Sequence, residues 1–165
     1  MPFAVTHILV PIIVVSLIRA HWPKLKHKIT IHEIFIAGLF GLLPDIDIPI
    51  SWINHYLTGA PLELLHRTYT HNFTFVLIIF VAAYLFKLAK NKKYYVMGLL
   101  AAMGYASHIL LDWLAVGYVQ PFWPLSAAEF GLNLIPGFAL KGLDAVLIVF
   151  WIWHEEKYKK IKSFY

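Results

Sequence analysis

The chain has 165 residues, of which 60% are hydrophobic and 14% are charged, with a formal net charge of +5 and no cysteine. Soluble domains are about 45–50% apolar and about 25% charged, so this composition excludes an ordinary soluble protein and indicates an integral membrane protein. The missing cysteines exclude disulfides and thiolate-bound metals. A basic chain can bind nucleic acid, but these basic residues lie in short loops, as membrane topology predicts, so we expect no nucleic-acid partner.

Five apolar segments predict an all-α fold, a polytopic bundle of about five transmembrane helices that forms one integral membrane domain over residues 1–165. The N-terminal segment lacks the basic start and the cleavage site of a signal peptide, and we interpret it as a retained helix. Residues 117–137 are rich in proline and glycine and should form an irregular loop before the last helix. In chain order the segments are Phe3–Ile18, Ile34–Ile50, Phe73–Phe86, Tyr94–Ala115 and Leu134–Trp153.

The basic residues predict the orientation in the cell membrane. Three basic segments alternate with the apolar ones and fall on the same side of a five-helix bundle, whereas the other side holds only Arg67 and Lys141. Because cytoplasmic loops carry the excess of Lys and Arg, we expect the N-terminus outside and the C-terminus in the cytoplasm. The basic segments contain Arg19, Lys24, Lys26 and Lys28, then Lys87, Lys90, Lys92 and Lys93, and finally Lys157, Lys159, Lys160 and Lys162.

Histidine and aspartate gather in three clusters that interrupt or adjoin the apolar segments. A charged side chain at the middle of a bilayer costs about 2.5–3.5 kcal/mol, so such residues indicate a function. With this topology the clusters, His7 and Asp144 all fall on the outer side at similar depth, while most other histidines fall on the inner side. The resulting candidate metal ligands are His7, Asp45, Asp47, His66, His71, His108 and Asp112.

Local spacing supports ligation by these side chains. His108 and Asp112 are four residues apart and share one helix face. Pro44 and Pro49 flank the aspartate pair, so we expect the helix to unwind there and an extended Asp45-Ile46-Asp47 to present both carboxylates on one side. Thr70 and Asn72 are possible N-caps for the third long helix.

Each cluster also has a structural interpretation. Asp45 could cap a helix, His66 and His71 could be plain loop residues, and His108 with Asp112 could form an intramembrane hydrogen bond. Asp144 could pair with Lys141 or Arg67 instead of binding metal. The gathering of all these residues on one side disfavours a purely structural explanation for the whole set.

The order of the motifs resembles the family of membrane-bound metal-dependent hydrolases, which includes the LexA-regulated inner-membrane hydrolases. The resemblance covers nearly the whole chain and implies hydrolysis assisted by a bound metal. The pattern is also similar, more loosely, to zinc-dependent phospholipase C, a helical enzyme with a His- and Asp-bound metal cluster, although the chain lacks that enzyme's N-terminal Trp ligand. The motifs are Thr6-His7, Leu43-Pro44-Asp45-Ile46-Asp47, His66-Arg67-Thr68-Tyr69-Thr70-His71, Ser107-His108-Ile109-Leu110-Leu111-Asp112 and Phe122-Trp123-Pro124-Leu125.

The chemistry that we expect is water activation by a divalent metal. Nitrogen and oxygen ligands suit zinc, with manganese or iron as alternatives, and seven candidate ligands exceed the three or four that one ion needs, so two or more ions are plausible. The catalytic candidates are Asp47 or Asp144, either as general base or as a support for a metal ligand, and Arg67 as the group that holds a phosphate or oxyanion. A site at the outer interface would meet membrane lipids or lipid-linked intermediates, and phosphoester hydrolysis is the leading reaction.

Two other classes of function stay open at this stage. A polar cluster in a small bundle could belong to a metal-ion or proton-coupled transporter, although the inner halves of the segments lack matching polar residues. Alternatively, a metal could stabilise the bundle without catalysis. The sequence leaves the oligomeric state open.

Overall fold

The computed structural model describes residues 4–26, 29–62, 67, 69–115 and 118–158, and these residues form helices and loops. Within this part of the chain the nearest approach to a sheet is an isolated bridge between Val119 and Phe130 in the loop before the last helix. The all-α prediction is therefore confirmed. The elements are α1 (Ala4–His21), α2 (Pro23–Lys26), α3 (Ile31–Leu42), the 3₁₀ helix η1 (Leu43–Ile46), α4 (Asp47–Thr58), α5 (Phe73–Leu88), α6 (Lys92–Ala115) and α7 (Gly137–Lys157).

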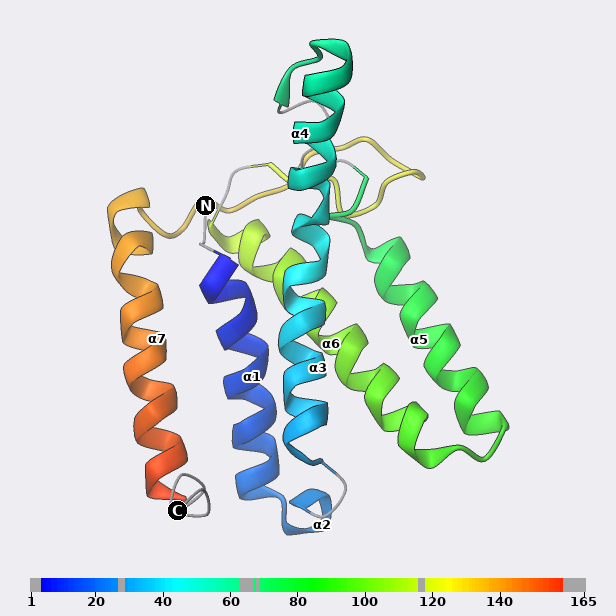
Figure 1. Cartoon of the computed structure of the whole chain (residues 1–165), viewed down its shortest axis with the longest axis vertical. Helices are drawn as coiled ribbons and strands as arrows, with labels where there is room; N and C mark the ends of the chain where they lie inside the picture. Colours follow the sequence, from blue (N-terminus) through cyan, green and yellow to red (C-terminus); the bar gives the residue numbers. More distant parts are fainter. Residues whose placement is uncertain (1–3, 27–28, 63–66, 68, 116–117, 159–165) are drawn as a thin grey trace.

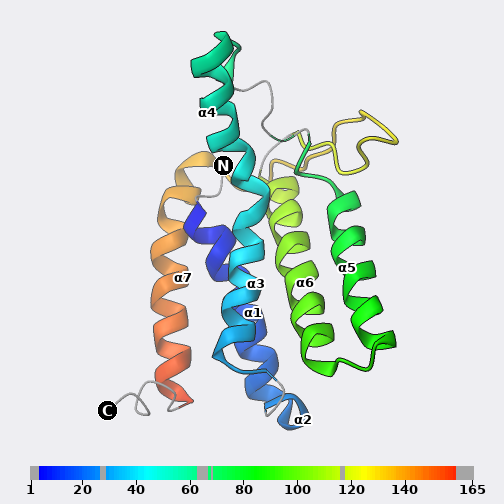
Figure 2. The same ribbon diagram turned by 45° about the vertical axis from the view of Figure 1, so that its right-hand side comes forward.

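The long helices lie side by side (Figures 1 and 2). Helix α3 packs against both α1 and α6, while α5 packs on the far side of α6 and α7 on the far side of α1. The order across the bundle is thus α5, α6, α3, α1, α7. This order places α1, α3 and α6 in the middle, where their side chains can meet.

Among the described residues, three stretches of helix are long and apolar enough to cross a membrane, namely Ala4–His21, Ile31–Thr58 and Lys92–Ala115. Helix α5 is also apolar but has only 16 residues. The expectation of about five long helices is met, and the helical membrane bundle is confirmed. The stretch that contains α3, η1 and α4 has 28 residues. At 1.5 Å per residue it is about 42 Å long, which exceeds the bilayer core of about 30 Å. Helix α4 accordingly projects beyond the other helices (Figure 1).

The expected unwinding at the aspartate pair is wrong. Residues Leu43–Ile46 form a 3₁₀ turn, and α4 starts directly at Asp47. Pro44 stands in the first turn of the 3₁₀ helix, where its missing N–H leaves no hydrogen bond unmade, and Pro49 stands in the first turn of α4. Prolines break the interior of a helix, but these two are tolerated because they lie at the starts of the two elements. The backbone therefore forms a 3₁₀ turn here and does not become extended.

Two helix starts are fixed by side-chain caps. Thr30 and Glu33 form a capping box at the start of α3, with the Thr30 N–H donating to a Glu33 carboxylate oxygen at 2.8 Å. Asn72 caps α5 by accepting a hydrogen bond from the Thr74 N–H at 3.1 Å, as its sequence position predicted. This cap fixes the segment directly before α5, which carries His71.

Glycine allows the three central helices to meet closely. A Cβ atom on Gly41 of α3 would lie 2.3 Å from the His7 carbonyl oxygen of α1, and one on Gly104 of α6 would lie 2.1 Å from the Ala37 carbonyl oxygen. Neither position can hold a side chain unless the helices move apart. Below this crossing the core is apolar and contains Ile12, Val15, Ile34, Ala37 and Leu100.

The two ends of the bundle differ in charge. Helix α2, the turn between α5 and α6, and the end of α7 lie at one end, with Lys24, Lys87, Lys90 and Lys157 among their residues (Figure 1). Helix α4 and the loop between α6 and α7 lie at the opposite end. The three basic segments predicted to share one side therefore do share one end, as far as their residues are described.

Candidate metal centre

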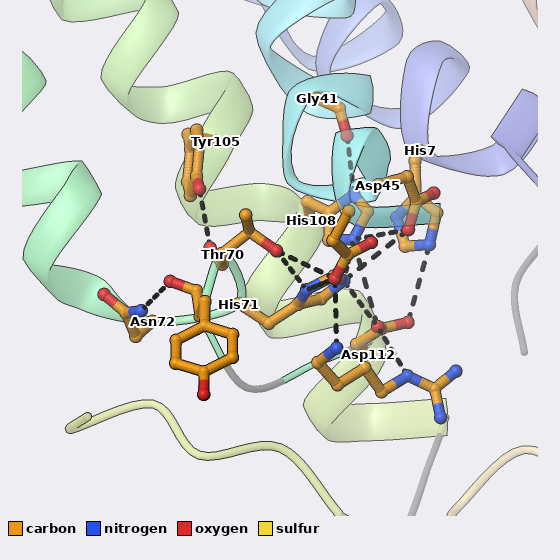
Figure 3. Close-up of polar contacts among 12 residues, drawn as sticks. His7, Gly41, Asp45, Thr70, His71, Asn72, Tyr105, His108 and Asp112 are labelled. Carbon is orange, nitrogen blue, oxygen red and sulfur yellow. Dashed lines mark hydrogen bonds and ion pairs between the residues drawn. The ribbon is translucent and has the colours of Figure 1, made fainter. Parts of the chain in front are cut away.

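Five histidine and aspartate side chains converge at the end of the bundle that lies away from the lysines, and they point toward one another (Figure 3). We call them the His/Asp cluster. Four are buried, and the Asp45 side chain is 12% exposed. The members are His7 of α1, Asp45 of η1, His71 before α5, and His108 and Asp112 of α6.

The position of His108 follows from the glycine crossing. Because α6 approaches α3 so closely at Gly104, the His108 ring reaches the α3 backbone, and its Nδ1 atom donates to the Gly41 carbonyl oxygen at 2.7 Å. A carbonyl can only accept, so the proton is on Nδ1 and Nε2 faces the cluster as an acceptor. This arrangement is typical of a histidine that binds metal through Nε2.

Three donor atoms have the spacing of ligands on one metal ion. The Nε2 atoms of His71 and His108 are 3.0 Å apart. Asp45 Oδ1 lies 3.5 Å from the first and 3.6 Å from the second. Ligands at about 2.1 Å from a tetrahedral zinc are about 3.4 Å apart. The triangle of these three atoms therefore matches one face of a zinc coordination sphere.

Asp112 and His7 extend the cluster on the other side of His108. Asp112 Oδ2 lies 3.5 Å from His71 Nε2 and 3.9 Å from His108 Nε2. Its Oδ1 atom lies 3.5 Å from His7 Nε2. The His7 ring stacks on the His108 ring with a centroid distance of 3.7 Å. His7, His108 and Asp112 thus form a second group of possible ligands, which shares His108 with the first.

The cluster lacks hydrogen bonds that its burial demands. Asp45 Oδ1 and both carboxylate oxygens of Asp112 are buried and have no hydrogen-bond partner in the described part of the chain. The nearest charged neighbours of these oxygens, namely the His7 and His71 rings and the Arg67 guanidinium, lie 3.4–3.5 Å away and form ion pairs without a hydrogen bond. Buried carboxylates that lack hydrogen bonds are costly, and a bound cation would reduce that cost. The donor set contains imidazole nitrogen and carboxylate oxygen without thiolate, which suits zinc, manganese or iron. The residues present therefore fit a divalent metal.

Asp47 lies behind His71. Its Oδ2 atom accepts hydrogen bonds from the Arg67 N–H at 3.0 Å and the Thr70 hydroxyl at 2.9 Å, and it lies 3.3 Å from His71 Nδ1. Asp45 faces the other nitrogen of the same ring. A carboxylate on the far nitrogen fixes the tautomer and orientation of a metal-binding histidine.

The charge on His71 reflects the same neighbours. Burial alone would lower the pKa of the imidazole, but the carboxylates of Asp45 and Asp47, which lie 3.5 Å and 3.3 Å from its two nitrogens, outweigh it and raise that pKa from 6.5 to about 9. In the metal-free protein at neutral pH, His71 therefore carries a proton on each ring nitrogen and is positively charged. A metal ion at this place must displace that proton.

Arg67 is the one arginine beside the cluster in the described part of the chain. It is buried, its Nε atom lies 3.4 Å from Asp112 Oδ2, and its guanidinium lies over the Tyr118 ring at 5.0 Å. Its Nη2 atom is buried and has no hydrogen-bond partner among the described residues. Its backbone φ is +64°, which is uncommon outside glycine. The backbone bends here so that the Arg67 N–H reaches Asp47.

One predicted site residue, Asp144, is not a member of the His/Asp cluster. Asp144 of α7 accepts a hydrogen bond from the Thr6 hydroxyl of α1, a partner that neither predicted pairing included. Thr6 precedes His7, so Asp144 fixes α7 against α1 beside the cluster. His66 lies outside the described residues.

Sequence reasoning did not assign three groups that support the cluster. The Gly41 carbonyl gives no sequence signal, because its role depends on the helix crossing. The sequence indicates Thr70 only as a possible cap. The Thr70 hydroxyl lies 3.0 Å from His71 Nδ1, and the position of Thr70 directly before His71 is a signal for this contact. Tyr118, which lies under Arg67, comes from a loop without a recognisable pattern.

Comparison with known proteins supports the membrane assignment. The sequence model of a family described as YdjM inner membrane protein matches residues 1–164. The chain belongs to the YdjM inner membrane protein family. The resemblance to inner-membrane proteins is thereby confirmed, while hydrolysis and the likeness to phospholipase C stay predictions. The curated proteins and the solved structures contain no match to this chain.

Proposed function

We propose that the chain is a metal-dependent hydrolase of the cytoplasmic membrane, which cleaves a phosphoester in a lipid or lipid-linked substrate. The observation that carries this proposal is the convergence of two histidine Nε2 atoms, 3.0 Å apart, with buried carboxylate oxygens that have no hydrogen-bond partner in the described chain. Such a set serves a divalent cation better than it serves the metal-free fold.

The first ion would be held by His71 and His108 through Nε2 and by Asp45 or Asp112 through a carboxylate oxygen. Because the His108 Nδ1 atom donates to Gly41, His108 has a single nitrogen to give, so the two ligand groups do not supply two complete sites. A second ion would use His7 and Asp112 with further ligands, for which His66 is a candidate from the sequence. Zinc is the metal that we favour.

A bound divalent ion would lower the pKa of a water molecule and polarise the phosphorus centre. We assign Arg67 to the phosphate, because its Nη2 atom is buried without a partner and a guanidinium binds phosphate oxygens in pairs. We assign Asp47 to positioning His71, since its Oδ2 atom already faces three donors. The Asp112 oxygen that does not hold the ion would then accept a proton from the attacking water, in place of Asp47 or Asp144.

The positive-inside rule places this site at the extracytoplasmic face. The described lysines of α2, of the α5–α6 turn and of the end of α7 lie at the bundle end opposite to the His/Asp cluster (Figure 1). The cluster then lies near the outer headgroups, where lipid phosphates are available. A C-terminal reporter that responds on the outer side would contradict this orientation.

A structural metal is the nearest alternative, and the burial of four of the five cluster residues favours it. Structural sites are closed, whereas catalytic sites keep a position for water. A transport function has less support, because the core below the cluster is mainly apolar, with residues such as Val15, Ile34 and Leu100, and the buried polar residues of α1 and α3 there are Ser16 and Glu33 within the described part of the chain.

The test is turnover of a panel of phospholipids and lipid phosphates by zinc-loaded protein in detergent or nanodiscs. We expect wild type and His55→Ala to release product, since His55 is an exposed histidine of α4 that does not belong to the cluster. We expect His108→Ala to be inactive. Full zinc binding without turnover of any phosphoester would support the structural alternative and sink the hydrolase proposal.

A further inference from the structure

An apolar groove runs along α1 and α3 and ends at the His/Asp cluster. Its outer part has a volume of about 440 Å³ and reaches from Leu39 and Leu42 to Asp45 and Pro49. Its inner part has a volume of about 500 Å³ and reaches from the same two leucines to Phe35. Leu39 and Leu42 line both parts, so the two parts are adjacent, and we call them together the α1–α3 groove.

The groove is long enough for a lipid chain of one leaflet. Its lining runs from His32 of α3 to Pro49 of α4, and these seventeen positions correspond to about 26 Å along the helix axis. Half of a bilayer core of about 30 Å is about 15 Å. The α1–α3 groove lies on two helical stretches that are long and apolar enough to cross the membrane. A hydrocarbon chain of the outer leaflet can therefore lie within it.

Asp45 connects the groove to the metal centre. It lines the outer part of the groove, and its Oδ1 atom lies 3.5 Å from His71 Nε2. It is also the most exposed member of the His/Asp cluster, with 12% of its side chain exposed. Asp45 is thus the member of the cluster that borders the groove, while its Oδ1 atom is buried on the cluster side.

The charge of Asp45 decides when a phosphate can approach. Asp45 is the charged side chain among those that line the outer groove. Without a bound metal ion, its carboxylate repels an anionic headgroup. A divalent ion on Asp45 reverses the local charge and attracts phosphate. The groove and the cluster therefore suit one molecule with a long apolar chain and a phosphate at its end, and binding of that molecule should depend on the metal.

We propose that the α1–α3 groove binds a hydrocarbon chain of an outer-leaflet phospholipid or lipid phosphate while the phosphate lies at the His/Asp cluster. The substrate enters laterally from the bilayer. This inference rests on the proposed function and adds to it the requirement for a long chain and the route of entry.

The binding test uses a phosphatidylglycerol with a photoreactive diazirine in its acyl chain, in nanodiscs, followed by mass spectrometry of the labelled peptides. We expect zinc to increase labelling around Leu39 and Leu42 several-fold, and we expect His108→Ala to remove this increase. Labelling around Leu77 of α5 reports ordinary surrounding lipid, and it should not respond to zinc. Leu39 and Leu77 are each 61% exposed, so they are matched in access. Equal and zinc-independent labelling of both helices would overturn the proposal.

The activity test uses Leu39→Trp to narrow the groove and Leu77→Trp as its matched control. For a long-chain substrate we expect Leu39→Trp to lower kcat/KM by about tenfold, since the indole displaces buried methylene groups of the chain. A dihexanoyl substrate with the same headgroup should lose much less kcat/KM in Leu39→Trp than the long-chain substrate does, and Leu77→Trp should cleave both substrates as wild type does. Equal loss on both substrates would contradict the groove. A wild type that cleaves neither substrate would contradict the hydrolase proposal, and the labelling experiment would still decide about the groove.

Discussion

The Nε2 atoms of His71 and His108 lie 3.0 Å apart, and the Nδ1 atom of each ring has a partner on its far side. With the His108 proton on Nδ1 and the His71 proton directed at Asp47, two nitrogen lone pairs would face each other across the cluster. That arrangement is repulsive unless a cation lies between them. In the metal-free protein a second proton on His71 serves this purpose, and a divalent ion would replace it.

The role of Asp47 behind His71 predicts an effect of charge alone. Asp47→Asn keeps the shape of the side chain but removes the negative charge from the far side of the ring. We expect zinc affinity to fall by about 10–100-fold, the usual effect of losing such a support. Competition with a zinc chelator measures it. Glu129→Gln removes the same charge at an exposed loop position and should leave the affinity unchanged. An unchanged affinity in Asp47→Asn would remove the positioning role.

Proton release on metal binding follows from the pKa of His71. Because that pKa is raised from 6.5 to about 9, the proton stabilises the metal-free fold fully below pH 6.5, and this stabilisation is lost as the pH rises through about 9. Zinc must displace the proton, so its affinity should increase with pH over the same range and level off above about 9. Calorimetry in buffers of different ionisation enthalpy would count the protons. No release at pH 7.5, or equal release by His71→Gln, would contradict the assignment.

The crossing at Gly41 predicts that a single methyl group disturbs the site. In Gly41→Ala the new Cβ would lie 2.3 Å from the His7 carbonyl oxygen, so α1 must move away from α3. Such overpacking costs about 1–3 kcal/mol, and we also expect weaker zinc binding because His7 and His108 shift. Gly142→Ala in α7 is the control, since no atom lies within 4 Å of its new Cβ. Unfolding in detergent and zinc titration measure the two effects, and equal behaviour of the two variants would contradict the tight crossing.

The sequence predicted the parts of this arrangement that depend on local rules. The apolar segments located the long helices, spacing alone put His108 and Asp112 on one face, and the cap preference identified Asn72. The charge of the loops placed the histidine and aspartate clusters at one end. These predictions hold because helix periodicity and capping depend on a few neighbouring residues, and membrane insertion depends on the composition of a whole segment. Both kinds of signal can be read from a single sequence.

The sequence could not predict which partner each side chain finds. The proline pair predicts an extended Asp45-Ile46-Asp47. A proline breaks a helix when it lies in the helix interior, but it is tolerated in the first turn. Tertiary packing decides where each helix begins, and therefore which of the two cases applies. The sequence leaves Asp47 open as a metal ligand, a general base or a support for a ligand, and its position behind His71 depends on the bend at Arg67. The carbonyl of Gly41 became important only through contacts between helices that are distant in sequence.

The buried Nη2 atom of Arg67 predicts a role in substrate binding that is separate from metal binding. We expect Arg67→Lys to lower kcat/KM on the best phosphoester by about 10–100-fold, chiefly through KM, because an ammonium cannot bind two phosphate oxygens in the guanidinium geometry. Zinc content should stay as in wild type. If Arg67→Lys loses zinc, then Arg67 acts by neutralising Asp112, which lies 3.4 Å from its Nε atom, and the phosphate assignment fails.

The metal content of the purified protein tests the metal centre most directly. Elemental analysis of protein prepared without chelators should find about one transition-metal ion per chain, with zinc the leading candidate. His108→Ala and Asp112→Ala should each abolish that content, while His55→Ala should retain it. Wild-type protein that is folded, yet holds no transition metal even after incubation with zinc, manganese and iron, would contradict the assignment of the His/Asp cluster as a metal centre.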